Sequence, residues 1–167
     1  MTNRKDKSHQ FARVYGVYPC TGGFAFAVVE VRARLVDWGK IDLGIETDKE
    51  FGARLADELE RSKPWAVATE VCENTNRQAK ARRRVGLARN AARQFEIECL
   101  PIDRRAIRIC LGLSRMATRH DVAEELCRVF PELAHRLPKR SIWKRDPRIH
   151  LFMALSLAWA AASQAAA

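Results

Sequence analysis

Residues 12–43 read ARVYGVYPCTGGFAFAVVEVRARLVDWGKIDL, and this stretch decides the fold. It contains three short runs rich in Val, Phe, Tyr and Ile, at Ala12–Tyr18, Phe24–Arg32 and Arg34–Leu43, with a Gly-Gly pair between the first two. Such runs are typical of antiparallel strands joined by hairpins. In the second run both alternating faces are apolar, as in a strand that is covered on both sides. The sequence therefore predicts a three-stranded antiparallel meander with the second run as its interior strand.

Beyond residue 43 the pattern alternates between helices and strands. We expect two strands, Trp65–Val71 and Glu96–Pro101, and four helices, at Lys49–Arg61, between Asn74 and Phe95, at Thr118–Val129 and at Pro147–Ser163. A meander followed by alternating strands and helices predicts a mixed sheet with helices packed on it. The first of these strands ends on Glu70, and the carboxyl ends of buried strands are where open α/β sheets carry their chemistry.

Composition bounds the class of protein. The chain has 167 residues, 30 Lys and Arg against 20 Asp and Glu, a formal charge of +10, and 47% hydrophobic residues. These values predict one domain, which we place at 11–163, after a flexible arm at 1–10 and before a frayed tail at 164–167. The longest strongly apolar stretch, Leu151–Ala162, is shorter than the roughly 20 residues that cross a bilayer, so we expect no membrane partner. Five scattered cysteines fit neither a disulfide framework nor a zinc site and indicate a cytoplasmic protein.

The helix between Asn74 and Phe95 is basic along its whole length. Seven Lys and Arg residues fall there without one acidic residue. A helix that needed only solubility would carry both signs of charge, so this face predicts contact with a polyanion, and nucleic acid is the leading partner. A solvated face without a partner is the alternative. The residues that we assign to nucleic-acid binding are Arg77, Lys80, Arg82, Arg83, Arg84, Arg89, Arg93, Arg115 and Arg119.

The order of the elements and several short motifs resemble the RuvC-type branch of the RNase H-like nucleases. The motifs are, in chain order, Gly16–Pro19 with Gly22–Val28 as the first hairpin, Ala66–Glu70 as a strand ending on a metal-binding Glu, Pro101, Ile107–Gly112 and Ala117–Val122 before a helix, and Ile149–Ala158 as the last helix. The resemblance implies an α/β RNase H-like fold with a mixed five-stranded sheet, three antiparallel strands and then two parallel strands, and helices on both faces.

The resemblance also implies a metal site and a substrate. Members of this family hydrolyse phosphodiesters of branched DNA as dimers, with Mg²⁺ ions held by carboxylates. Carried over residue by residue, the four ligand positions hold Tyr18, Glu70, His150 and Met153. A tyrosine hydroxyl stays protonated at neutral pH and a thioether does not hold Mg²⁺, so we interpret Tyr18 and Met153 as degenerate catalytic positions. Glu70 and His150 are the remaining candidate metal ligands.

Asp146 is the acid that could complete such a site. It lies four residues before His150 and seven before Met153, so a regular helix would place all three on one face. The three candidate catalytic residues also have purely structural interpretations. In these interpretations Asp146 caps the final helix, Glu70 pairs with an arginine at the end of its strand, and His150 is a core histidine.

Three functions are compatible with these observations. The first is a RuvC-like protein that binds nucleic acid, DNA rather than RNA and branched or structured DNA in particular, with a metal site too degraded for efficient cleavage. The second is an active endonuclease of the junction-resolvase kind, with Glu70, His150 and Asp146 as catalytic residues and Mg²⁺ or Mn²⁺ as cofactor. The third is a structural or protein-interaction module that pairs through its apolar final helix. A homodimer is compatible with each of them.

Overall fold

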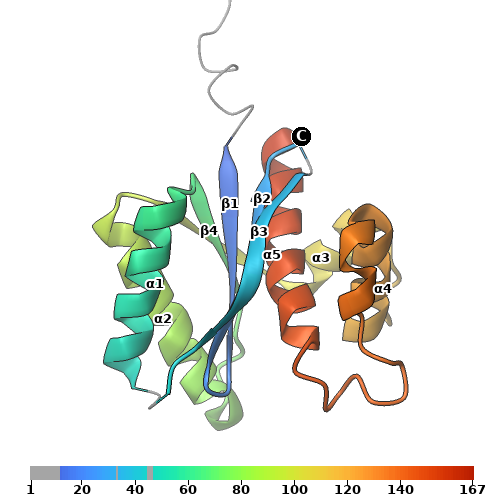
Figure 1. The fold of residues 1–167 in the computed structure, drawn as a ribbon, viewed down its shortest axis with the longest axis horizontal. Coiled ribbons are helices and arrows are strands. Elements are labelled where there is room, and N and C mark those ends of the chain that lie inside the picture. The colour runs from blue at the N-terminus through green and yellow to red at the C-terminus, as the bar shows by residue number, and fades with distance from the viewer. Residues whose placement is uncertain (1–11, 33, 45–46) are drawn as a thin grey trace, which may run out of the picture.

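Five strands form one mixed sheet at the centre of the molecule (Figure 1). The computed structural model describes residues 12–32, 34–44 and 47–167. The strands lie in the order β3-β2-β1-β4-β5, with the bounds β1 Arg13–Cys20, β2 Gly23–Glu30, β3 Arg34–Asp42, β4 Ala66–Glu70 and β5 Glu98–Ile102. β2 pairs antiparallel with both β1 and β3, whereas β4 pairs parallel with both β1 and β5. The predicted meander, its interior second strand and the mixed sheet are confirmed.

Helices cover both faces of this sheet (Figure 1). On one face lie α1 (Asp48–Ser62) and α2 (Ala79–Gln94). On the other face lies α5 (Ile149–Ala166), with α3 (Arg104–Cys110) and α4 (Arg119–Val129) packed against it. Two short 3₁₀ helices, η1 (Asn76–Gln78) and η2 (Pro131–Arg136), precede α2 and follow α4. The sheet therefore separates two apolar cores, and α5 forms the centre of the larger one.

β1 passes very close to α5 at Gly16. A Cβ atom at this position would lie more than 1 Å inside the ordinary contact distance of 3.4 Å from the backbone oxygen of Ala154, and 3.0 Å from the Cβ atom of Ala158. Small residues on both elements therefore permit the close packing of the strand and the helix. Since side chains alternate along a strand, Gly16 and Tyr18 share the face toward α5. The contact places Tyr18 beside the first turns of α5.

α5 is the core helix of the domain. By length and composition its 18 residues could cross a membrane, which the shorter apolar stretch in the sequence did not indicate, but 67% of the helix is buried inside the molecule. Phe152 and Leu155 are fully buried against the sheet. The helix is thus committed to its own domain and offers little apolar surface to another protein. This burial leaves little of the final helix for the pairing that the interaction module was predicted to make.

The ends of the elements differ from the prediction in informative ways. The final helix begins at Ile149 and continues to Ala166, so most of the predicted tail at 164–167 is helical. The fifth strand begins at Glu98, because Glu96 adopts a left-handed φ of +56° at the turn after α2. Thr47 and Thr118 cap α1 and α4, where their side chains accept the backbone N–H groups of Glu50 and Asp121. The predicted arm at residues 1–10 lies outside the described residues.

Candidate functional site

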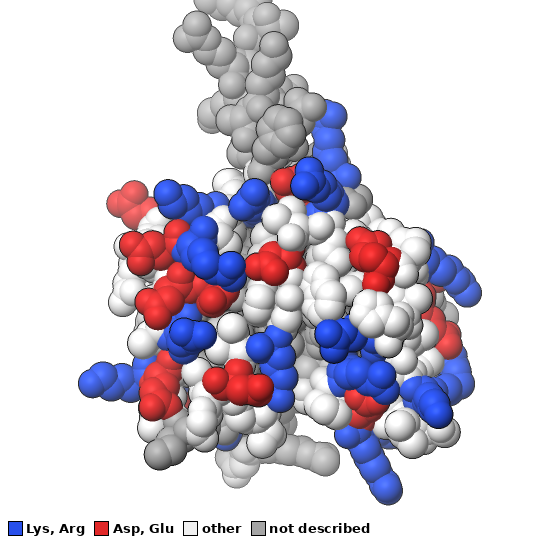
Figure 2. Space-filling model, viewed as in Figure 1, with Lys and Arg blue, Asp and Glu red and all other residues white. Residues whose placement is uncertain are grey.

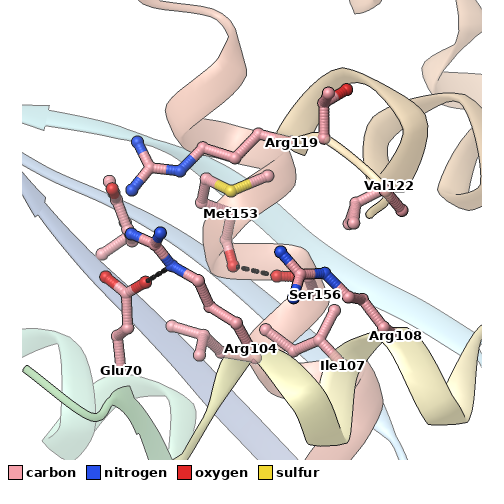
Figure 3. Close-up of a pocket in the computed structure, with 12 residues that line it drawn as sticks. Glu70, Arg104, Ile107, Arg108, Arg119, Val122, Met153 and Ser156 are labelled. Carbon is pink, nitrogen blue, oxygen red and sulfur yellow. Dashed lines mark hydrogen bonds and ion pairs between the residues drawn. The ribbon is translucent and has the colours of Figure 1, made fainter. Parts of the chain in front are cut away.

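The carboxyl ends of β1 and β4 lie beside the first half of α5, and a pocket opens where these elements meet (Figure 3). Tyr18 comes from β1, Glu70 from β4 and Met153 from α5. His150 precedes Met153 by one turn, and its ring stacks on that of Tyr18 with the centroids 5.7 Å apart. The structure thus brings together the four positions that the RuvC-type resemblance selected. The remaining residues of the pocket are Arg104, Ile107, Arg108, Ala117, Thr118, Arg119, Val122, Ser156 and Leu157.

Glu70 is already paired in this pocket. The Arg104 Nε–H donates to Glu70 Oε1 at 3.1 Å, and 18% of the Glu70 side chain is exposed. The sheet explains the contact, because Glu70 lies opposite Ile102 on β5 and the chain then turns directly into α3. Asp103 fixes that turn by accepting the backbone N–H of Ala106. The alternative in which Glu70 pairs with an arginine at the strand end is therefore the arrangement observed.

Tyr18 and Met153 supply no anionic oxygen. Burial raises the pKa of the Tyr18 hydroxyl, and the negative charge of Glu70 raises it further, so the hydroxyl keeps its proton at neutral pH. The Arg119 guanidinium carbon lies 5.9 Å from the centre of the Tyr18 ring. Met153 is 7% exposed and packs with the apolar core of α5. Both side chains pack in the structure, Tyr18 against His150 and Met153 within the core around α5.

His150 is held in its neutral form at this site. Burial lowers its pKa, and the positive charges of Lys40 and Arg119 lower it further. Within the described part of the chain, its buried Nδ1 atom has no hydrogen-bond partner. Lys40 extends from β3 and pairs with Asp42 at 3.2 Å. Cations thus approach His150 at the position where a metal site would need acids.

Asp146 does not join the pocket, contrary to the prediction that it completes the site. Its Oδ2 atom accepts from Arg148 Nη2 at 2.6 Å, and its Oδ1 atom accepts the backbone N–H of Arg148 at 3.0 Å. These hydrogen bonds lower the pKa of Asp146. The carboxylate therefore orders the turn before α5, which is close to its interpretation as a cap, although Arg148 is the residue at the N-cap position.

The donors at this site do not fit Mg²⁺ or Mn²⁺. Such cations require several carboxylate, carbonyl or water oxygens. The pocket offers one carboxylate that is bound to a guanidinium, together with a protonated phenol and a thioether. In residues 12–32, 34–44 and 47–167, no group of three or more His, Cys, Asp or Glu side chains is arranged to hold a metal ion. The geometry thus does not support the predicted Glu70 and His150 ligand pair.

The basic residues predicted to bind nucleic acid fall into two groups. Three on α2 make contacts within the protein, and one of them, Arg84, is buried, so its predicted role in nucleic-acid binding is not supported. Arg84 is 2% exposed, pairs with Asp48 at 3.2 Å and lies over the Phe51 ring. Arg83 also pairs with Asp48, at 2.7 Å, while Arg82 donates to backbone carbonyl oxygens in the loop before α2. Arg84 therefore supports the packing of α1 on α2.

The second group faces solvent. Lys80, Arg89, Arg93 and Arg115 are exposed, and Arg119 is half-buried beside Tyr18. The side chain of Arg77 lies outside the described part of the structure. A second groove, of about 280 Å³, begins on the other side of Tyr18 and is lined by His150 and Lys80 among others. Tyr18 lines both the groove and the pocket.

Charge is not uniform over the surface. Figure 2 shows acidic groups interspersed with basic groups on the face that carries α1 on its left and α4 on its right. Ion pairs between opposite charges, such as those of Arg140 with Asp121 and Glu124, also occur in the structure. A strongly basic patch is thus not a property of this face, and the net charge of +10 alone does not locate a binding surface.

The contact of Arg104 with Glu70 is the feature of the site that the sequence did not identify. The helix that carries Arg104, α3, has only seven residues, which is too short for an apolar period to reveal. A signal was nevertheless present. Glu70 ends β4 opposite Ile102 on β5, so a residue two positions beyond Ile102 emerges beside Glu70. The contact thus follows from the register of the last two strands, which the predicted strand bounds did not include.

The sheet order, the parallel pairing of β4 and the helices on both faces are the RuvC-type RNase H-like fold. Thermus thermophilus RuvC matches with a TM-score of 0.68 at 23% identity, over 89% of this chain and 92% of that chain. Its complex with a Holliday junction substrate matches with a TM-score of 0.66 at 23% identity, over 89% of this chain and 91% of that chain. The Fowlpox virus resolvase in complex with Holliday junction DNA has a TM-score of 0.55 at 12% identity, over 92% of this chain and 98% of that chain.

No protein-family model and no curated protein sequence matches the chain. At 12–23% identity these matches establish the fold, and they confirm the predicted RuvC-type resemblance as a likeness of fold.

Proposed function

We propose that the protein binds branched DNA at the end of the sheet where β1, β4 and α5 meet and does not cleave it efficiently. One observation carries the second half of this proposal. The carboxylate at the metal-ligand position, Glu70, is bound to Arg104, and the neighbouring ligand positions hold a protonated phenol and a thioether. Metal-dependent hydrolysis needs cations that are fixed by anionic oxygens, and this pocket does not provide them.

Two features support DNA as the ligand. Proteins of the same fold have been solved with Holliday junction DNA, namely Thermus thermophilus RuvC and the Fowlpox virus resolvase. In this chain the cations Lys80, Arg89, Arg93 and Arg115 are exposed and can contact phosphates, and Tyr18 lines both the pocket and the groove to which Lys80 contributes. Each phosphate that these cations neutralise releases condensed counterions, which favours binding at low salt.

Binding is tested by fluorescence anisotropy with a four-way DNA junction, a duplex, a single strand and the matching RNA duplex over a range of salt concentrations. The junction should bind most tightly, and the logarithm of the affinity should fall linearly with that of the salt concentration. Removal of Arg89 and Arg93 together should make the slope shallower by about 1 to 2. Arg128→Ala on α4, whose side chain is 76% exposed and pairs with Glu125, is the matched control. Equal affinity for all four nucleic acids would contradict the preference for branched DNA.

Cleavage is tested on the same substrates with Mg²⁺ and with Mn²⁺. The expected result is that the wild-type protein leaves the junction intact under conditions in which it is fully bound. The Glu70→Gln variant, purified in parallel, controls for a contaminating nuclease. Junction cleavage by the wild-type protein that is lost in Glu70→Gln would establish an active metal site and refute this half of the proposal.

A further inference from the structure

The pocket carries positive charge of its own. Among the residues that line it, Arg104, Arg108 and Arg119 are three cations and Glu70 is one anion, which leaves a formal charge of +2. A divalent cation that entered would be repelled, whereas a phosphodiester, which carries a single negative charge, would be attracted. The charge balance therefore favours an anion at the position where the fold would otherwise place metal ions.

Arg104 is oriented to receive such an anion. Its Nε–H is engaged by Glu70 at 3.1 Å, which fixes the plane of the guanidinium, and 52% of its side chain is exposed. Figure 3 shows its guanidinium between the carboxylate of Glu70 and the guanidinium of Arg119. A guanidinium has five N–H donors in a planar fork that matches two phosphate oxygens. Because Nε–H is the group that donates to Glu70, the Nη1 and Nη2 groups remain to donate to a ligand at the mouth of the pocket.

Arg119 supplies a second guanidinium on the same side. It lies at the start of α4 and over the Tyr18 ring, whereas Arg108 extends along the opposite side of the pocket, near Ser156 (Figure 3). The cavity has a volume of about 30 Å³ above an apolar floor. That volume holds about one water molecule and excludes a nucleobase. A ligand must therefore sit at the mouth and present small polar atoms, as a backbone phosphate does.

We infer that Arg104 and Arg119 bind one backbone phosphate of the branched DNA directly, and that Glu70 positions Arg104 for this contact instead of holding a metal ion. The inference rests on the proposed function, because the phosphate belongs to the bound junction. Charge-assisted hydrogen bonds from a planar guanidinium supply the attraction, so the contact requires no divalent cation.

The test measures junction and single-strand binding by anisotropy in EDTA and in Mg²⁺ at matched ionic strength. Wild-type affinity should be the same in both buffers. Arg104→Ala should weaken junction binding about tenfold, the effect of losing one charge-assisted contact, and Arg104→Lys should recover only part of the loss because it lacks the fork. Arg128→Ala on α4, which removes one exposed arginine outside the pocket, is the matched control and should change the affinity less than about threefold. Thermal melting confirms that each variant is folded.

A modified junction makes the assignment specific to phosphate. Neutral methylphosphonates replace, one at a time, the phosphates around the branch point. At one position the substitution should weaken wild-type binding and abolish the difference between the wild-type protein and Arg104→Ala. If the difference persists at every position, the contact is not made to a phosphate at the branch point, and the inference is overturned.

The remaining outcomes separate this inference from the proposed function. Junction binding that requires Mg²⁺, or that is unchanged in Arg104→Ala, would overturn the inference and leave the proposed function standing. Equal binding of the junction and the single strand, both dependent on Arg104, would refute the preference for branched DNA and support the phosphate contact. Failure to bind either nucleic acid would overturn both.

Discussion

Replacement of Gly16 by alanine tests the packing that builds the site. The added Cβ atom would lie more than 1 Å inside ordinary contact with the backbone oxygen of Ala154, and 3.0 Å from Ala158. A flexible side chain could yield at such a contact, but here the obstacle is the backbone of the core helix. We therefore expect Gly16→Ala to destabilise the protein by about 3 kcal/mol, at the upper end of the usual range for an overpacked core. In a domain of this size the melting temperature should fall by about 6 to 12 °C.

Thermal denaturation followed by circular dichroism measures this effect. Gly52 and Gly86 are matched controls, since both lie inside helices and a Cβ atom at either position would meet nothing within 4 Å. Alanine at these positions should stabilise the protein, by up to about 1 kcal/mol each, because it favours the helix. An unchanged melting temperature in Gly16→Ala would refute the close contact of β1 with α5, and with it the placement of Tyr18 beside His150.

Two further predictions concern groups that the structure buries. Arg84→Ala should lower the free energy of unfolding by about 2 kcal/mol in urea titrations, because it removes a buried guanidinium from the Phe51 ring while Asp48 keeps its ion pair with Arg83. An effect below about 0.5 kcal/mol would place Arg84 on the surface. Burial lowers the pKa of His150 in the folded state, so below about pH 6.5 the unfolded chain binds more protons than the folded one. The free energy of unfolding should therefore decrease as the pH is lowered below this value, by at most about 1.4 kcal/mol per pH unit for this group. Urea titrations at about pH 7.5 and about pH 5.5 should show a smaller loss in His150→Gln than in the wild-type protein, and an equal loss would rule out this linkage.

The architecture could be predicted because it depends on local patterns. The strand Phe24–Arg32 is apolar on both faces, which identifies it as interior before any partner is known, and the strand ending on Glu70 is bounded by Pro64 and by polar residues. Helix α3 could not be predicted in the same way. Its seven residues include three arginines, and it is fixed by the cap at Asp103 and by packing against α5.

The site could be predicted only in part, because local patterns fix the positions of its residues but not their partners. The positions of Tyr18, Glu70, His150 and Met153 follow from the order of the elements, and the structure brings them together. Their partners depend on the positions of side chains that are distant in the sequence. Glu70 and Arg104 are separated by 34 residues, and only the register of two parallel strands places them in contact.

Asp146 shows where a prediction from sequence spacing fails. Its spacing from His150 matches a helical face, but the chain before Ile149 is not helical, and the carboxylate binds Arg148. Spacing arguments hold only inside a regular element, and Asp146 lies outside one.

Direct measurement of Mn²⁺ binding tests the central claim, that the pocket is occupied by protein cations and not by metal ligands. Electron paramagnetic resonance reports free Mn²⁺ as the wild-type protein and Glu70→Gln are titrated without DNA. The account predicts that the two proteins remove Mn²⁺ from solution equally little, because Glu70 is committed to Arg104. Saturable binding of Mn²⁺ by the wild-type protein that is lost in Glu70→Gln would contradict the account and restore the metal-dependent nuclease.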